Sequence, residues 1–142
     1  MIGTFGGQEF RMSAPFSLGT VGHFSLAVTD PRASADWYIE NLGMREEFEY
    51  DGGIAIGSDG VTIALSCRKP DPAAFGHMSF HLKDVATLRA ALAYLKANGI
   101  KVEDPGNEIG PEAPGSPNVA IWLHDPDGYR LELSVQDGAK DL

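Results

Sequence analysis

Two stretches of this 142-residue chain begin alike, and each places a histidine directly after a glycine. GHFSLAVTD carries His23 and GHMSFHLKD carries His77, so the two imidazoles occupy equivalent positions 54 residues apart. A carboxylate, Glu132, lies in a third strand-like stretch, YRLELSV. Two imidazoles and one carboxylate suit Fe(II), Mn, Ni, Co or Zn and leave coordination positions open. The predicted chemistry is Lewis-acid activation of a small substrate that chelates a divalent metal ion through two adjacent oxygens.

Strand alternation predicts that these donors share one face of a sheet, because successive side chains of a strand point to opposite sides. In the first stretch Phe24, Leu26 and Val28 form an apolar set, which we expect to pack under the helices. The fourth histidine, His124, joins the opposite face unless a bulge at the DPDG turn shifts its register. The polar face then carries His23, Ser25, Thr62, Ala64, Ser66, His77, Ser79, His81, Arg130, Glu132 and Ser134.

The elements that position these residues occur twice, in the order β-α-β-β-β. In the first copy Asp30 and Pro31 begin a helix and Gly43 ends it, since these are favoured capping residues. In the second copy Asp84 caps a helix whose apolar residues recur at helical spacing until Gly99. The predicted strands cover residues 21–29, 44–50, 53–57, 61–67, 76–82, 100–103, 118–124 and 129–135. The sequence therefore predicts an α+β fold of two βαβββ modules that form a curved, partly closed mixed sheet.

The length fits a single domain that is preceded by a leader. We expect a flexible leader over residues 1–18 and one domain over residues 19–142. Module one covers about residues 20–68 and module two about residues 75–136. The loop at residues 104–117 is rich in Gly and Pro, and loops of this length are often lids, so we expect it to cover the cleft.

The chain is acidic: 11 Lys and Arg against 20 Asp and Glu give a net charge of −9. This charge argues against nucleic acid and anionic membranes as partners. No apolar run approaches the ~20 residues of a membrane span, and the start of the chain lacks the apolar core of a signal peptide. One cysteine, Cys67, cannot form an internal disulfide, which fits a reducing compartment. We expect a cytoplasmic protein that acts on a small-molecule substrate.

Three segments together resemble the vicinal oxygen chelate superfamily, which includes glyoxalase I, extradiol dioxygenases, fosfomycin resistance enzymes, methylmalonyl-CoA epimerases and bleomycin-binding proteins. They are GHFSLAVTD with the following ADWYIENLGM, then GHMSFHLKD, and LHDPDGYRLEL. The resemblance covers roughly residues 21–135. It implies the glyoxalase/bleomycin resistance/dihydroxybiphenyl dioxygenase fold and a homodimer whose modules can pair across chains, with two sites per dimer.

The resemblance also implies metal ligands on the first and last strand of each module. Carried over to this sequence, those positions are His23, Ala64, His77 and Glu132. Because an alanine cannot coordinate a metal, three ligands remain. The triad looks like that of extradiol dioxygenases and of fosfomycin thiol transferases, although Trp122 stands where the extradiol enzymes have a tyrosine.

The remaining site residues follow from their places on the polar face. Trp122 and Ser25 are predicted to line the substrate pocket, and His124 is the acid/base candidate. Three functions stay open: a metal-dependent enzyme with dioxygenase-like or glyoxalase/lyase-like chemistry, a non-catalytic drug- or metabolite-binding resistance protein, and a fosfomycin thiol transferase. A three-ligand metal site favours dioxygenase-like chemistry slightly, since it leaves more positions open, and the thiol transferase lacks its cationic receptor.

Overall fold

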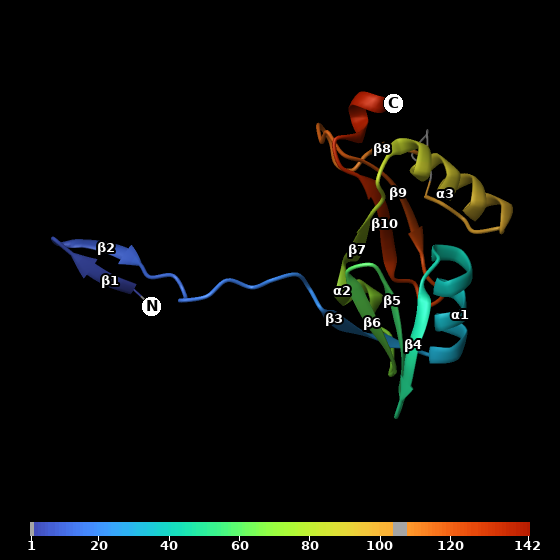
Figure 1. Cartoon of the computed structure of the whole chain (residues 1–142), viewed down its shortest axis with the longest axis horizontal. Helices are drawn as coiled ribbons and strands as arrows, with labels where there is room; N and C mark the ends of the chain where they lie inside the picture. Colours follow the sequence, from blue (N-terminus) through green and yellow to red (C-terminus); the bar gives the residue numbers. More distant parts are fainter. Residues whose placement is uncertain (1, 104–107) are drawn as a thin grey trace.

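The computed structural model describes residues 2–103 and 108–142, and two βαβββ modules follow one another along the chain (Figure 1). Module one consists of β3 (His23–Val28), α1 (Pro31–Leu42), β4 (Arg45–Tyr50), β5 (Gly53–Ser58) and β6 (Val61–Cys67). Module two consists of β7 (His77–His81), α3 (Val85–Ala97), β8 (Gly110–Pro111), β9 (Val119–His124) and β10 (Arg130–Val135). The predicted α+β class and the repeated modules are confirmed.

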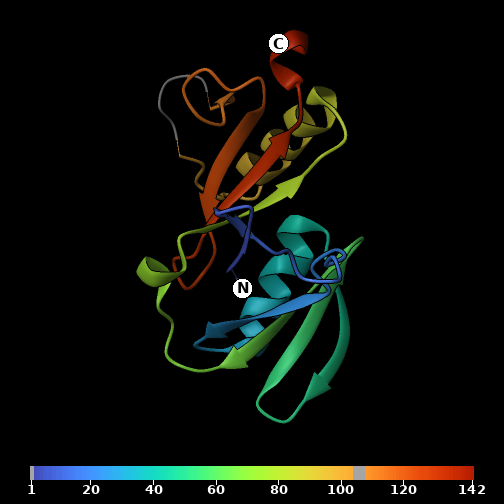
Figure 2. The same ribbon diagram turned by 90° about the vertical axis from the view of Figure 1, so that its left-hand side faces the viewer.

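Each module has its own mixed four-stranded sheet, in the order β3-β6-β5-β4 or β7-β10-β9-β8. In both sheets the first strand pairs in parallel with the last strand, in the same register. His23 lies opposite Thr62 as His77 lies opposite Arg130, so Ala64 occupies in module one the place of Glu132 in module two. Within the described residues no strand of one sheet pairs with the other sheet, and Figure 2 shows the two modules one above the other.

The helices cover the apolar face of the sheets, as predicted. Figure 1 shows α1 and α3 on the same side of the molecule. Asp30 caps α1 by accepting hydrogen bonds from the N–H groups of Arg32 and Ala33, and Gly43 ends it with φ 67°. No helix in the described part of the chain is long and apolar enough to cross a membrane. The core under the helices includes Leu26, Val28, Ile63, Leu65, Leu88, Leu95, Leu131 and Leu133.

A buried carboxylate lies at the contact between the two modules. Asp125, 6% exposed in the β9–β10 turn, accepts N–H groups of Asp127 and Tyr129 at 2.9 Å each and the Tyr38 hydroxyl at 2.6 Å. The Tyr129 hydroxyl donates to the Ala27 carbonyl of β3 at 2.7 Å. Burial, above all, raises the pKa of Asp125, and its three hydrogen bonds act against that rise. The turn of module two is therefore docked on α1 and β3 of module one.

Three described segments differ from the sequence prediction or add to it. The predicted strand at residues 100–103 is wrong: within it only Val102 forms an isolated bridge, to Leu123, and the strand that pairs with β9 on this edge is β8, at Val119 and Ala120. The linker contains a short helix, α2 (Pro72–Phe75), and the C-terminus forms η1 (Gly138–Asp141). Of the predicted loop, residues 104–107 lie outside the described residues.

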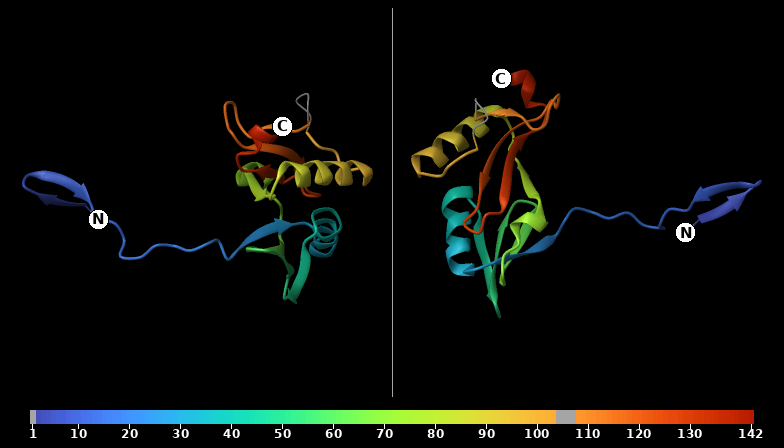
Figure 3. Two further views of the ribbon diagram at one scale, coloured as in Figure 1. Left: turned by 45° about the horizontal axis from the view of Figure 1, so that its top comes forward. Right: turned by 180° about the vertical axis from the view of Figure 1, so that it is seen from behind.

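The leader forms a hairpin of β1 (Ile2–Phe5) and β2 (Gln8–Arg11) that the sequence reading missed. Gly6 and Gly7 have φ of 58° and 81°, as a two-residue type I′ turn requires, so the Gly-Gly pair was the signal. Figures 1 and 3 show this hairpin away from both modules, joined to β3 by an extended segment. The predicted flexibility of residues 1–18 stays a prediction.

The junction between the modules predicts the effect of Tyr38→Phe. The variant leaves Asp125 buried with one donor fewer, so the free energy of unfolding should fall by about 1.5–3 kcal/mol. Urea denaturation measures it. Tyr94→Phe is the matched control, because the exposed Tyr94 hydroxyl donates to the neutral Glu40 carbonyl at 2.7 Å and its loss should cost less than about 1 kcal/mol. Equal losses of unfolding free energy in the two variants would show that the buried Asp125 carboxylate does not make the Tyr38 hydroxyl more important than the Tyr94 hydroxyl.

Candidate functional site

The polar face of module two brings most of the predicted site residues together. Across β7, β10 and β9 the register aligns side chains in rows on one face. One row is His77, Arg130 and His124, and the next is Ser79, Glu132 and Trp122. No bulge interrupts the register of His124, so it shares the face of the other histidines, as predicted. His77 and Glu132 therefore lie in neighbouring rows on adjacent strands.

Glu132 is a buried carboxylate with unused hydrogen-bonding capacity. It is 2% exposed, and its Oε1 accepts the Ser79 hydroxyl at 2.5 Å. Within the described residues its Oε2 is buried without a partner. Burial is the main cause that raises the pKa of Glu132; the Ser79 hydroxyl lowers it, nearby Glu112 raises it and His77 lowers it. A buried carboxylate oxygen without a donor is costly, and a cation held jointly with His77 would satisfy it, so these residues fit a metal.

Trp122 is held between two cationic or ionisable side chains. The Arg130 guanidinium lies 3.9 Å from the centre of the indole ring, and the His77 ring meets the indole edge to face at 5.1 Å. Arg130 also donates from Nε and Nη2 to Glu103 at 2.8 and 3.0 Å, which lowers the pKa of the Glu103 carboxyl. The sequence placed Arg130 on this face without giving it a role. Its contacts show that Arg130 packs on the Trp122 indole and pairs with Glu103.

His124 lies at the rim rather than beside Glu132. Its Nδ1 is 3.8 Å from Glu103 Oε2, and its side chain is 50% exposed. It contributes to a pocket of 430 Å³ that also contacts Trp37 of α1 and Pro126 of the turn. The acid/base role of His124 stays a prediction.

Module one supplies the other predicted residues, on a separate sheet. His23 and Ser25 are exposed on β3, opposite Thr62 and Ala64. Over residues 2–103 and 108–142 no three His, Cys, Asp or Glu side chains gather closely enough to hold a metal ion. One chain thus brings His77 near Glu132 and does not bring His23 to them.

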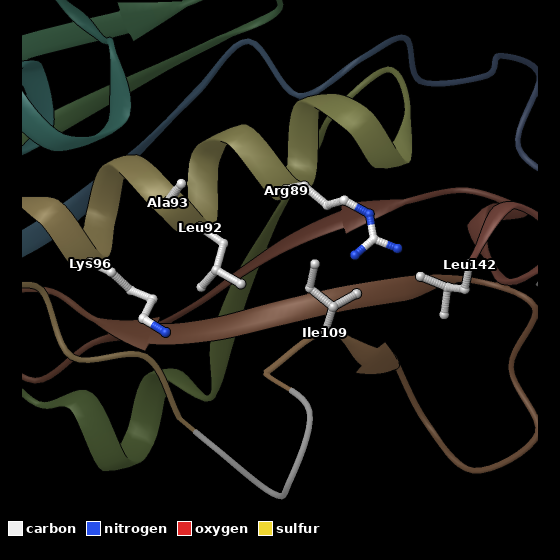
Figure 4. A pocket seen from close by; sticks show the side chains of 6 residues that line it. All are labelled: Arg89, Leu92, Ala93, Lys96, Ile109 and Leu142. Carbon is white, nitrogen blue, oxygen red and sulfur yellow. The ribbon is translucent and has the colours of Figure 1, made fainter.

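Two further hollows lie beside the helices. A groove of 960 Å³ runs between α1 and α3 around the unpaired edge of β7, and it reaches Ser79 and His81. A pocket of 680 Å³ lies between α3 and the segment before β8, on the helix side of the sheet (Figure 4). None of the predicted site residues lines that second pocket, which is formed by Arg89, Leu92, Ala93, Lys96, Ile109 and Leu142.

A family model, Glyoxalase/Bleomycin resistance protein/Dioxygenase superfamily, matches residues 20–133. The chain belongs to this superfamily. Among solved structures it is similar to the oxidase ChaP-H2, with 17% identity and a TM-score of 0.67 over 87% of this chain and 99% of that one. It is also similar to a lactoylglutathione lyase from Agrobacterium tumefaciens, with 16% identity and a TM-score of 0.64 over 87% and 97%. A Vibrio cholerae integron cassette protein has 20% identity and a TM-score of 0.66 over 84% and 97%. At these identities the structural likeness shows the fold alone.

The hydrogen bond from Ser79 to Glu132 leads to a prediction about stability, and the equivalent residue of module one provides the control. Ser79→Ala removes the donor to a buried carboxylate, so the free energy of unfolding should fall by about 1–3 kcal/mol in chelator-treated protein. Ser25→Ala changes the equivalent exposed residue opposite Ala64, and its effect should stay within about 0.5 kcal/mol. Urea denaturation of both variants checks this. A loss in Ser25→Ala as large as in Ser79→Ala would show that Glu132 is not the cause.

Proposed function

We propose that this protein is a metal-dependent enzyme of its superfamily that acts on a small substrate with two vicinal oxygens. The observation that supports it most is the buried Glu132 carboxylate, which has one oxygen without a partner in the described structure and lies near His77. His23, His77 and Glu132 would hold the divalent ion. When bound, that ion would polarise the substrate oxygens as a Lewis acid.

The protein's own residues would orient the ligand and the substrate. The Ser79 hydroxyl fixes one oxygen of Glu132 and leaves the other free to coordinate. Trp122, supported by Arg130, forms a rigid aromatic wall beside that carboxylate, against which a planar substrate can stack. In module one, Ser25 lies in the same row of the sheet as Ala64 and Ala55, and these small side chains would leave room for the substrate.

The two half-sites would complete one another in a homodimer. Because one chain does not bring His23 to His77 and Glu132, module one of one copy would face module two of a second copy, which gives two sites per dimer. β3 and β7 are each the outermost strand of their sheet in the described chain, so His23 and His77 both lie at a sheet edge that a second copy could approach.

Two reaction classes fit this site. The oxidase and the lactoylglutathione lyase among the similar structures are named for an oxidation and for a lyase reaction. Vicinal oxygens bound to the metal suit dioxygenase-like chemistry as well as glyoxalase/lyase-like chemistry. Oxygen uptake with catechols and isomerisation of a hemithioacetal separate the two, and metal binding without either would favour a binding or resistance protein.

Metal analysis tests the proposal directly. We expect wild-type protein, supplied with Fe(II), Mn²⁺ or Ni²⁺, to bind about one ion per chain, as two shared sites per dimer require. His77→Ala should weaken binding by more than about 100-fold, since it removes a ligand rather than a supporting contact. His81→Ala, on the same strand and face, should bind as the wild type does. A wild-type chain that takes up no stoichiometric metal would refute the enzyme proposal.

Mixing two inactive variants tests whether the site is shared. His23→Ala and His77→Ala homodimers should each bind metal weakly. If subunits exchange at random, mixed dimers would regain one intact site each, so roughly a quarter of all sites should recover wild-type affinity. Isothermal titration of the exchanged mixture measures that fraction. No recovery, after exchange has been verified by mass spectrometry, would place both halves in one chain.

A further inference from the structure

A glutamate of β4 lies on the polar face of module one, next to the row that contains His23. The β4–β5 pairing has a bulge between Glu46 and Phe48, and Glu47 is the extra residue. Its Oε2 accepts the Thr62 hydroxyl at 3.0 Å. Thr62 lies directly opposite His23 in the parallel pair of β6 and β3. The Glu47 carboxylate is therefore one strand away from the imidazole.

A glycine of β5 provides the space for this carboxylate. Gly57 pairs with Thr62 and so belongs to the same row as His23. A Cβ atom at Gly57 would collide with Oε1 and Cδ of Glu47. The side chain thus lies flat across the backbone of β5, in a place that only glycine leaves open.

The internal repeat gives Glu47 a counterpart in module two. Glu103 receives its hydrogen bonds from Arg130, which lies opposite His77 as Thr62 lies opposite His23. The two carboxylates differ in whether a cationic side chain neutralises their charge. Glu103 forms a bidentate ion pair, whereas Glu47 has only the neutral Thr62 hydroxyl and no cationic partner in the described chain. Glu47 therefore carries an uncompensated negative charge beside His23.

We propose that Glu47 is the fourth protein ligand of the metal site and supplies the carboxylate that Ala64 lacks. This inference rests on the proposed function, because the other donors are His23, His77 and Glu132. Adjacent strands lie about 4.8 Å apart, so rotation of the glutamate side chain away from Thr62 would bring its carboxylate within reach of an ion held by His23. The donor set then contains two imidazoles and two carboxylates, one of each from either module.

A fourth donor narrows the reaction class. With four protein ligands, an octahedral ion would keep two positions, which a substrate with two vicinal oxygens would fill, and O₂ would then have no place beside it. The site accordingly favours an isomerase or lyase that acts on a chelating substrate over a dioxygenase.

Ni²⁺ affinity, measured by isothermal titration on the full-length protein, tests this role of Glu47. Glu47→Gln keeps the shape of the side chain and removes its charge, and we expect Ni²⁺ binding about 10- to 100-fold weaker than in the wild type. Gly57→Ala keeps every donor but fills the place of the carboxylate, and should weaken binding in the same direction. Glu49→Gln is the control, since Glu49 lies on the same strand and pairs with Arg32 of α1; its affinity should stay within twofold of the wild type.

The outcomes separate this inference from the function on which it rests. If His77→Ala loses Ni²⁺ while Glu47→Gln and Gly57→Ala both bind within twofold of the wild type, the site is real and Glu47 is not a ligand. If the wild type binds no Ni²⁺, the proposed function and this inference fail together. The absorption spectrum of the Co²⁺-loaded protein gives a second readout, because loss of a carboxylate ligand shifts the visible bands in Glu47→Gln and leaves them unchanged in Glu49→Gln.

Discussion

Parallel pairing between the first and last strands of each module is the constraint on which the rest of this structure depends. Two parallel neighbours need a long connection, and here a helix and two antiparallel strands supply it. The pairing fixes which side chains lie next to one another, so the serine two residues after each histidine meets a defined position of the last strand. It puts Ser79 against Glu132, and it leaves Ser25 against Ala64.

The contact between modules includes a buried carboxylate, and within the described residues the modules share no sheet. Asp125 accepts hydrogen bonds from two backbone N–H groups of its own turn and from a hydroxyl of α1 in the other module. Burial, followed by the neighbouring negative charge of Asp125, raises the pKa of the Tyr38 hydroxyl well above its usual range, so Tyr38 remains a donor. This junction involves α1, the start of module one and the turn between β9 and β10.

Local signals predicted the fold well, and long-range placement was beyond them. Asp30-Pro31 and Gly43 set the ends of α1 because capping is a property of neighbouring residues. Strict alternation placed Glu132 and Trp122 on one face correctly. The same rule missed Glu47, because the bulge in β4 adds one residue and so changes the face on which Glu47 lies. Its neighbours Glu46 and Glu49 point the other way and accept hydrogen bonds from Arg32 of α1. Nothing in the local pattern states how far His23 lies from His77, because that distance depends on how two modules meet.

The unequal rows of the two modules also bear on stereochemistry. A cleft built from two copies of one module would be nearly twofold symmetric, and a small ligand could enter it in either of two orientations. Here Ala55 stands in module one where Trp122 stands in module two, and the hydroxyl of Thr62 stands where the guanidinium of Arg130 does. In the proposed shared site, one wall is thus flat, aromatic and cationic, and the opposite wall has small side chains and the Glu47 carboxylate. A substrate held between them presents a single prochiral face, so divergence of the duplicated halves gives the cleft its handedness.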